Sequence, residues 1–198
     1  MIAAAFLRLE IARWLVPDDA VERERCLFGQ FRLHIRDTFS RDGRVQGIRD
    51  NGALVAAAVW TTHPSDAPPA RHSAALRSIT GPHHRRFRAL EDAVAAAAPQ
   101  IAHHSLTLLA AAHPGHGVGT RLLRHYLDWA DRRPGARPML HLVAVPGATR
   151  LYQRHGFVGG QPVEIRGSGG LSVHPMIRQP PARRPRRPEV AKLPEGEK

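Results

Sequence analysis

Residues 106–123 read LTLLAAAHPGHGVGTRLL, an apolar run that stops at His-Pro and then crosses three alternating glycines. The run predicts a buried strand over 105–112, and the leucine-rich pattern after the glycines predicts a helix over 120–132. Glycine weakens both kinds of element. Three glycines at this junction therefore predict a turn in which the bare backbone itself is needed.

A glycine turn between a strand and a helix is typical of phosphate-binding sites, and three kinds can be compared. A dinucleotide fingerprint needs a glycine where this chain has Thr120. A P-loop needs Gly-Lys-Ser/Thr, and the turn contains no lysine. The third kind is a cradle of backbone amides at the N-terminus of a helix. Its members here would be Gly115, Gly117 and Gly119, with Arg121 and Arg124 adding positive charge. On the glycines alone, a tight turn with nothing bound is an equal alternative.

A second pattern follows the buried strand that is expected over 138–145. Residues 147–157 read GATRLYQRHGF, and on a helix their apolar side chains share one face with Tyr152. Gly156 is placed to end this helix before the next strand.

Together the two patterns resemble the GNAT superfamily of N-acetyltransferases, and within it the puromycin N-acetyltransferase-like branch. That family shows a strand, a Gln/Arg-x-x-Gly-x-Gly/Ala loop, a leucine-rich helix, another strand and then A-x-x-L-Y-x-x-x-G-F. Here HPGHGVGT corresponds to the loop, and Ala148, Leu151, Tyr152, Gly156 and Phe157 correspond to the second motif. The stretches AAAFLRLEIARWLVPD and AAAVWTTHP extend the resemblance over residues 3–178.

The remaining patterns agree with an α/β domain. We expect helices over 2–14, 20–39 and 85–98, a hairpin turn at Asn51-Gly52, a loop over 62–73, and closing strands over 157–166 and 171–177. The resemblance implies a mixed, mostly antiparallel sheet flanked by helices. The first strand of the family is missing ahead of the first helix, so either the true start lies upstream of Met1 or the sheet lacks this edge strand. Residues 1–178 are predicted to form the domain and 179–198 a disordered Arg/Pro-rich tail.

The chemistry that the resemblance implies is direct attack of a small-molecule amine on acetyl-CoA, which is the cosubstrate. Pantetheine would lie between the strands 105–112 and 139–145. The expected cofactor-binding residues are Ala110, Ala111 and Ala112 for pantetheine, and Gly115, His116, Gly117, Val118, Gly119 and Thr120 for the pyrophosphate.

Tyr152 would be the general acid that protonates the departing thiolate. A phenol with a pKa of about 10 is protonated at neutral pH and suits a thiolate whose conjugate acid has a pKa of about 8.5. The alternative for Tyr152 is an aromatic side chain that only packs. Candidates for the general base are His103, His104, His141 and Glu91, each of which is equally explained as a structural or surface residue.

Two features depart from the family pattern. Pro114 stands at the Gln/Arg position and lacks an amide hydrogen, and the turn after Ala112 is about two residues short. The alternative function is therefore a degenerate member that binds nucleic acid or an acidic partner through its basic surface. The tail sequence RRPRR has no aromatic residues between its arginines, so stacking on bases is not predicted.

Composition limits the remaining possibilities. The net charge is +12, which suits a polyanionic ligand or a solvated arginine-rich surface. Cys26 is the one cysteine, which excludes an internal disulfide and a cysteine-rich metal site, and we predict no metal site. No stretch approaches the roughly 20 apolar residues of a membrane span, so a cytoplasmic protein is expected. A homodimer is compatible with the fold, although no sequence feature indicates one.

Overall fold

The computed structural model describes residues 1–40, 43–64 and 71–181, which build one seven-stranded sheet covered by helices. The strand order is β1-β2-β3-β4-β7-β5, and β6 pairs with β7 beside this path. In chain order the elements are α1 (Ile2–Phe6), α2 (Glu10–Leu15), α3 (Ala20–Phe39), β1 (Arg44–Asp50), β2 (Ala53–His63), α4 (Arg71–Thr80), η1 (Gly81–His83), α5 (His84–Ala96), β3 (His103–Ala111), α6 (Val118–Arg132), β4 (Met139–Ala144), η2 (Pro146–Ala148), α7 (Thr149–Gln153), β5 (Val158–Gly159), β6 (Val163–Glu164) and β7 (Ser172–Arg178).

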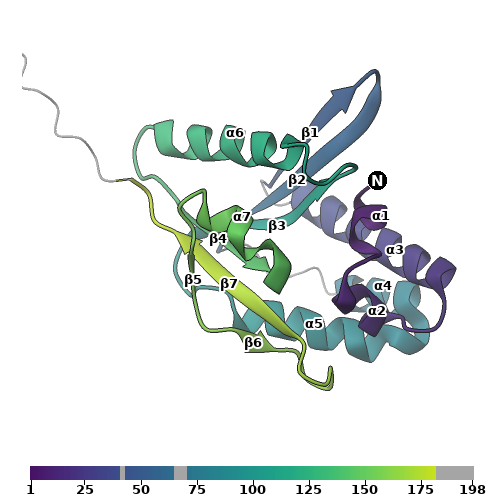
Figure 1. The fold of residues 1–198 in the computed structure, drawn as a ribbon. Coiled ribbons are helices and arrows are strands. Elements are labelled where there is room, and N and C mark those ends of the chain that lie inside the picture. Colours follow the sequence, from purple (N-terminus) through teal and green to yellow (C-terminus); the bar gives the residue numbers. More distant parts are fainter. Residues whose placement is uncertain (41–42, 65–70, 182–198) are drawn as a thin grey trace, which may run out of the picture.

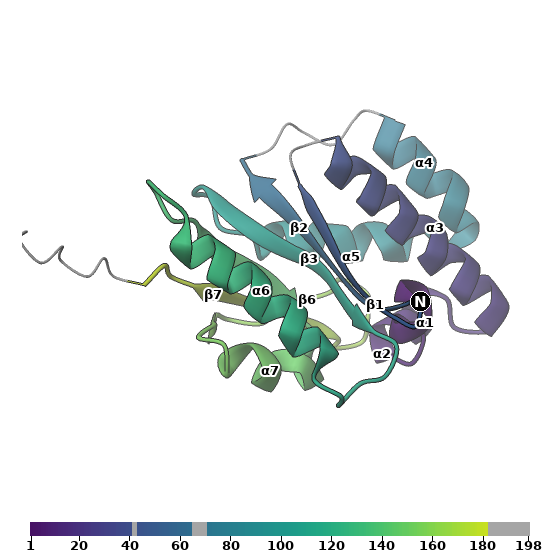
Figure 2. The same ribbon diagram turned by 90° about the horizontal axis from the view of Figure 1, so that it is seen from above.

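The sheet is the middle layer of the molecule (Figures 1 and 2). Helices α1–α5 cover one face, and α6 and α7 cover the other. Each face buries its own cluster of side chains: Phe31 and Phe87 lie under α1–α5, whereas Trp60 and Tyr126 lie under α6. The rings of Trp60 and Tyr126 stack with their centroids 3.7 Å apart. The predicted α/β class is confirmed, and within the sheet only β3 and β4 pair in parallel.

The predicted hairpin joins β1 and β2. Asn51 and Gly52 both have positive φ, 47° and 80°, as a two-residue hairpin turn of this kind requires. β1 lies at one end of the strand order, and the first element of the described chain is the helix α1. Among the described residues, the sheet therefore begins with this hairpin.

Helix α3 has the predicted bounds, because Asp19 caps it by accepting a hydrogen bond from the amide of Val21 at 2.8 Å. The apolar residues of this helix do not all lie on its buried side. Val21, Phe28 and Phe39 are 78%, 61% and 67% exposed, whereas Cys26 is buried. The buried side of α3 is set by the sheet and by α4, which hydrophobic periodicity within one helix cannot locate.

Four further expectations are corrected. The predicted helix over 2–14 is two helices, α1 and α2, separated at residues 7–9. The loop predicted over 62–73 is shorter than expected, because β2 extends to His63 and α4 already begins at Arg71. The closing strand expected over 157–166 is two short strands, β5 and β6.

The fourth correction concerns α6, which begins at Val118 rather than Thr120. Residues 179–181 follow β7, and the rest of the predicted tail lies outside the described residues.

Candidate functional site

The parallel strands β3 and β4 pair along only part of their length. Their register runs from His103 opposite Met139 to Leu106 opposite Leu142 and stops there. Both strands then continue without further pairing to each other. The C-terminal halves of two neighbouring strands are therefore separated, which opens the middle of the sheet.

A β-bulge marks the point of separation. On the β2 side, Trp60 lies opposite Leu106 and Val59 opposite Leu108, so Thr107 is the extra residue. Because of this insertion, Leu106 packs in the cluster under α6 whereas Leu108 packs in the cluster under α1–α5. The bulge thus changes which backbone and side-chain groups face the gap.

Backbone groups on the free edge of β3 face the separated strand. The amide of Ala112 donates to the carbonyl of Val55 at 2.9 Å. Since antiparallel pairs alternate, Ala110 also bonds toward β2, whereas Leu109 and Ala111 direct their backbone groups toward β4. Of the three alanines predicted to bind pantetheine, Ala111 thus presents both backbone groups to the gap. Leu109 was missed, because an inserted bulge residue leaves no trace in the sequence.

The glycine turn forms an open corner after β3. Gly115 and Gly117 have φ of 90° and 73°, which L side chains rarely adopt, and a Cβ at either position would meet no atom within 4 Å. Gly117 is the N-cap of α6 and provides no side-chain cap. The intrahelical ladder begins when the amide of Arg121 bonds to the carbonyl of Gly117. The amides of residues 118–120 precede that bond and have no intrahelical acceptor.

The corner formed by the glycine turn lies beside a small cavity. His116 is part of the turn, and its Nδ1 lies 3.3 Å from the carbonyl oxygen of Pro114. The cavity has a volume of about 380 Å³ and is lined by Asp50, Val55, His113, His116 and Val118. Side chains therefore do not fill the space beside the amides.

Arginines flank this end of the molecule. Arg121 and Arg124 are exposed on α6, and Arg154 is exposed at the end of α7. Burial, followed by the charges of Arg124 and Arg154, lowers the pKa of His155. These two arginines, from different helices, therefore create positive potential in one region, which favours an anionic ligand.

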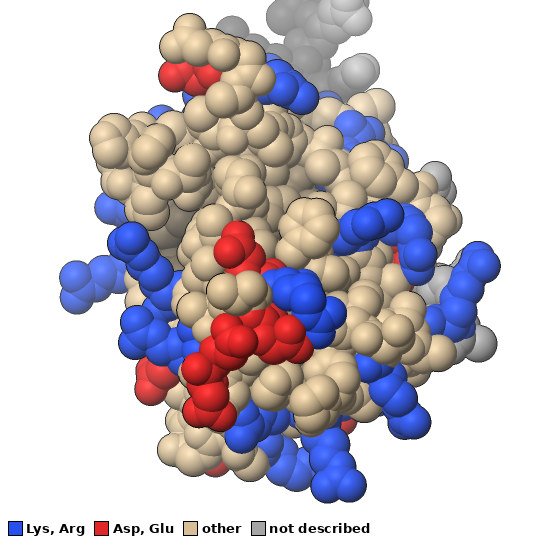
Figure 3. Space-filling view, turned by 90° about the vertical axis from the view of Figure 1, so that its right-hand side faces the viewer, with Lys and Arg blue, Asp and Glu red and all other residues tan. Residues whose placement is uncertain are grey.

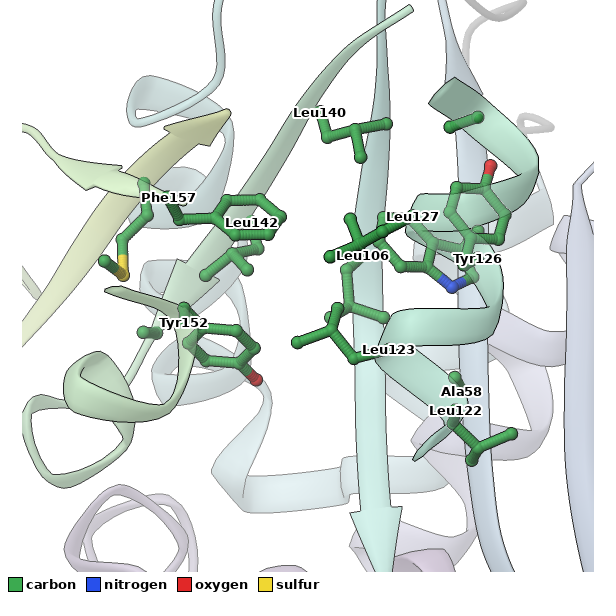
Figure 4. Close-up of a cluster of buried hydrophobic side chains, with 14 of the residues drawn as sticks. Ala58, Leu106, Leu122, Leu123, Tyr126, Leu127, Leu140, Leu142, Tyr152 and Phe157 are labelled. Atoms are coloured by element: carbon green, nitrogen blue, oxygen red, sulfur yellow. The ribbon is translucent and has the colours of Figure 1, made fainter. Parts of the chain in front are cut away.

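Tyr152 lies on α7 at the edge of the separated strands. Its side chain is largely buried and meets Phe157 edge to face with centroids 6.0 Å apart. Figure 4 shows the hydroxyl pointing from α7 toward the space between β4 and β3. Burial raises the pKa of Tyr152 to about 12, so the phenol is protonated at neutral pH.

A cavity of about 590 Å³ lies at the same gap, on the face covered by α1–α5. Thr107 and Leu108 line it from β3, and Val143 and Ala144 line it from β4. Helices α1, α2, α3 and α5 supply most of the remaining wall with apolar side chains. The volume is that of a small-molecule site.

Polar side chains in the wall of this cavity form a hydrogen-bonded network that the sequence did not indicate. His72 Nδ1 lies 2.7 Å from a carboxylate oxygen of Asp37, and His72 Nε2 lies 3.2 Å from one of Glu91. The other Glu91 oxygen accepts from Arg88 at 3.4 Å. His72 therefore connects two carboxylates that come from different helices. The residues come from α3, α4 and α5, so no sequence spacing connects them.

The structure distinguishes the four candidates for a general base by whether they line this cavity. His104 lies on the other face of β3, where its Nδ1 is 2.9 Å from the Tyr126 hydroxyl, and it does not line the cavity. Burial, followed by the charge of Arg133, lowers its pKa to about 4. His103, His141 and Glu91 all line the cavity.

Comparison with known protein families identifies the class. The model of the acetyltransferase (GNAT) family matches residues 8–157. This match covers most of the chain and includes the separated strands and the glycine corner. The protein therefore belongs to the GNAT family of acetyltransferases. No curated protein matches the sequence significantly.

Solved structures of acetyltransferases have the same fold. A histone acetyltransferase HPA2 and related acetyltransferase from Corynebacterium glutamicum is 25% identical, with a TM-score of 0.61 and coverage of 92% of this chain and 91% of that one. An N-acetyltransferase from Staphylococcus aureus is 12% identical, with a TM-score of 0.54 and coverage of 89% and 92%. A polyamine N-acetyltransferase from Drosophila melanogaster is 14% identical, with a TM-score of 0.51 and coverage of 88% and 91%. The last two support the fold alone.

Proposed function

We propose that the protein is an acetyl-CoA-dependent N-acetyltransferase that acts on an amine of a small molecule. The observation that carries the proposal is the coincidence of two features. The parallel strands β3 and β4 separate after Leu106 and Leu142, and a cavity of about 590 Å³ meets the sheet at that gap. A thioester held in the gap would thus face a closed space large enough for an acceptor.

In this proposal the cofactor is bound mostly by backbone groups. Pantetheine lies along the free edge of β3 at residues 110–112, with Leu109 added because of the bulge. The pyrophosphate lies on the corner formed by Gly115, His116, Gly117, Val118, Gly119 and Thr120. Unpaired amides and the positive end of the α6 dipole favour a diphosphate there. Pro114 lies ahead of these amides, so its missing amide hydrogen leaves the corner intact.

The reaction is direct transfer without an acyl-enzyme. The amine nitrogen forms a bond to the thioester carbonyl carbon, the C–S bond breaks, and the thiolate takes the proton of the Tyr152 hydroxyl. That hydroxyl points toward the gap (Figure 4). A low-polarity site raises the pKa of a departing thiol as well as that of the phenol, which keeps the two groups matched.

The acceptor is expected to combine an amine with an apolar body. Phe6, Leu9, Leu15 and Phe31 line one part of the cavity, which suits an aliphatic or aromatic group. This composition agrees with the antibiotic-like nucleoside or metabolite that the puromycin-like branch implies. Membership of that branch stays a prediction.

The alternative of a binding protein for nucleic acid has less support. Figure 3 shows Lys and Arg side chains spread around the face of α1–α4, with Asp and Glu gathered in a group near its centre. A nucleic-acid surface usually has a continuous basic patch or stripe, which this face does not show. None of the described helices is long and apolar enough to cross a membrane.

Two measurements on the purified protein test the proposal. Calorimetric titration is expected to show binding of acetyl-CoA, and incubation with a panel of small amines is expected to release free CoA thiol with at least one of them. Binding without release for any amine would leave the binding-protein alternative in place. Absence of binding would overturn the assignment of the corner and the gap.

A further inference from the structure

The cavity wall contains a histidine, His103, with one ring nitrogen that has no hydrogen-bond partner among the described residues. We propose that Nε2 of His103 accepts the proton of the attacking amine, which makes His103 the general base of the reaction. This inference rests on the proposed function and adds a catalytic residue to it.

The tautomer of His103 follows from one hydrogen bond. Its Nδ1 lies 2.7 Å from the backbone carbonyl oxygen of Ile101. A carbonyl oxygen can only accept, so Nδ1 carries the hydrogen. In the neutral ring, Nε2 therefore holds a lone pair, which is the form that a general base needs.

This lone pair is buried and unused. His103 is 3% exposed, and its Nε2 has no hydrogen-bond partner among the described residues. A buried polar atom without a partner is uncommon in folded proteins and calls for an explanation. A donor N–H brought into the cavity by a substrate provides one.

The ring of His103 is held on two sides. It stacks on His63 with centroids 4.6 Å apart and an interplanar angle of 9°, and it meets His141 edge to face at 5.3 Å. These contacts come from β2 and β4, the two neighbours of β3. The orientation of Nε2 is thus determined by the sheet, which is the rigid part of the molecule.

The position of His103 relative to the proposed thioester site suits a general base. Ser105 and His141 are paired across β3 and β4 one step before the separation, and their side chains lie 3.1 Å apart on the cavity side. His103 lies one step further back on the same face and also lines the cavity. His103 therefore lies on the same side of β3 as the cavity, and the proposal places the amine within reach of Nε2, directly or through one water molecule.

The two carboxylates in the wall are already engaged. Asp37 and Glu91 both bond to His72, and Glu91 also accepts from Arg88. In His141, Nδ1 bonds with Ser105, and Nε2 has no partner among the described residues, as in His103. Burial followed by the nearby His103 ring lowers the pKa of His141 to about 4, which makes it a weak proton acceptor. His141 is thus a neutral neighbour that adds no positive charge beside the proton acceptor.

The proposed step is balanced. The amine nitrogen bonds to the carbonyl carbon while its proton moves to Nε2 of His103, which becomes an imidazolium that still donates through Nδ1 to Ile101. The thiolate leaves with the proton of Tyr152. Solvent then removes the proton from His103 and returns one to Tyr152, so no redox partner is required.

The test compares His103→Asn, His103→Ala and the control His104→Ala. Asn keeps a donor for the Ile101 carbonyl but has no acceptor at the place of Nε2. We expect both His103 variants to lose about 10²–10⁴-fold in kcat, with acetyl-CoA affinity unchanged by calorimetry. Added imidazole should restore part of the rate in His103→Ala only. The control removes a histidine from the opposite face of the same strand and should retain its rate.

A second readout does not depend on activity. Nitrogen-15 NMR of the free wild-type protein should show His103 as the Nδ1–H tautomer, with an unprotonated Nε2. A protonated Nε2, or a His103→Asn variant within threefold of the wild-type kcat, would overturn the proposal. If the proposed function itself is wrong, the wild-type protein will neither bind acetyl-CoA nor transfer its acetyl group. That result would overturn both the proposed function and the role of His103.

Discussion

At the scale of single residues, the site depends on polar groups that the fold removes from water. Tyr152 and His103 are both largely buried; Tyr152 points toward the gap between β3 and β4, and His103 lines the cavity that meets this gap. Burial keeps the phenol protonated, and the bond to Ile101 places the hydrogen of the neutral imidazole on Nδ1, which leaves the lone pair on Nε2. A proton donor and a proton acceptor are therefore available in one site.

Replacement of the general acid should affect only the chemical step. We expect Tyr152→Phe to lower kcat by about 10²-fold or more, because no hydroxyl protonates the thiolate. The affinity for acetyl-CoA should be unchanged. Steady-state kinetics and calorimetry measure the two quantities.

Tyr126→Phe is the matched control, since Tyr126 is the chain's other tyrosine and its hydroxyl bonds to His104 under α6. It should retain the wild-type kcat. A Tyr152→Phe protein that transfers acetyl groups at the wild-type rate would exclude the acid role.

At the scale of secondary-structure elements, two junctions hold the site in place. The glycine turn connects β3 to α6 and presents the amides of the first helical turn. At the other end of α6, Arg178 on β7 bonds to Asp131 through both guanidinium nitrogens, at 2.8 and 2.6 Å. The helix is thus connected to β3 at one end and, at the other, to β7, the neighbour of β4.

The glycine turn is tested by Gly117→Ala. A φ of 73° strains an alanine by about 1–2 kcal/mol, so the turn is expected to relax and displace the amides. Acetyl-CoA affinity should fall about tenfold, which corresponds to roughly 1.4 kcal/mol. Gly169 has the same φ of 73° in the loop between β6 and β7, so Gly169→Ala should lose similar stability but no affinity. Equal affinities in the two variants would contradict the cradle.

The ion pair at the other end of α6 is tested by unfolding. Arg178 and Asp131 have side chains that are 16% and 26% exposed. We expect Arg178→Ala to lower the free energy of unfolding by about 1–2 kcal/mol, as for a partly buried, charge-assisted pair. Arg178→Lys keeps the charge but not the two parallel hydrogen bonds. Its free energy of unfolding should therefore lie between those of the wild type and Arg178→Ala. Urea midpoints measure this, and identical midpoints would show that the pair contributes nothing.

At the scale of the whole molecule, stability depends on buried neutral histidines. Burial lowers the pKa of both His104 and His141 to about 4 from a usual value of 6.5. Between these two pH values the unfolded chain binds protons that the folded chain does not. Stability should therefore decrease as the pH falls through this range.

We expect the free energy of unfolding to fall by on the order of 2 kcal/mol between pH 6.5 and pH 5. Urea denaturation at a series of pH values measures it. His104→Gln should reduce the slope, since one of the histidines whose pKa is lowered by burial is gone. A flat profile over this range would refute the assignment.

The sequence by itself determined the class and most of the elements. Local chemistry was sufficient for the hairpin at Asn51-Gly52 and the turn with Gly115 and Gly117, because positive φ is a property of short stretches. The order of the two motifs then indicated the family that comparison confirmed.

Only the tertiary structure decided where the strands separate and what faces the gap. The bulge at Thr107, the exposed face of α3 and the bonded group of Asp37, His72 and Glu91 depend on which elements pack together. Such contacts join residues far apart in the chain, and no periodicity within one element encodes them. For the same reason, His103 and His104 are equivalent in the sequence but lie on opposite faces of one strand.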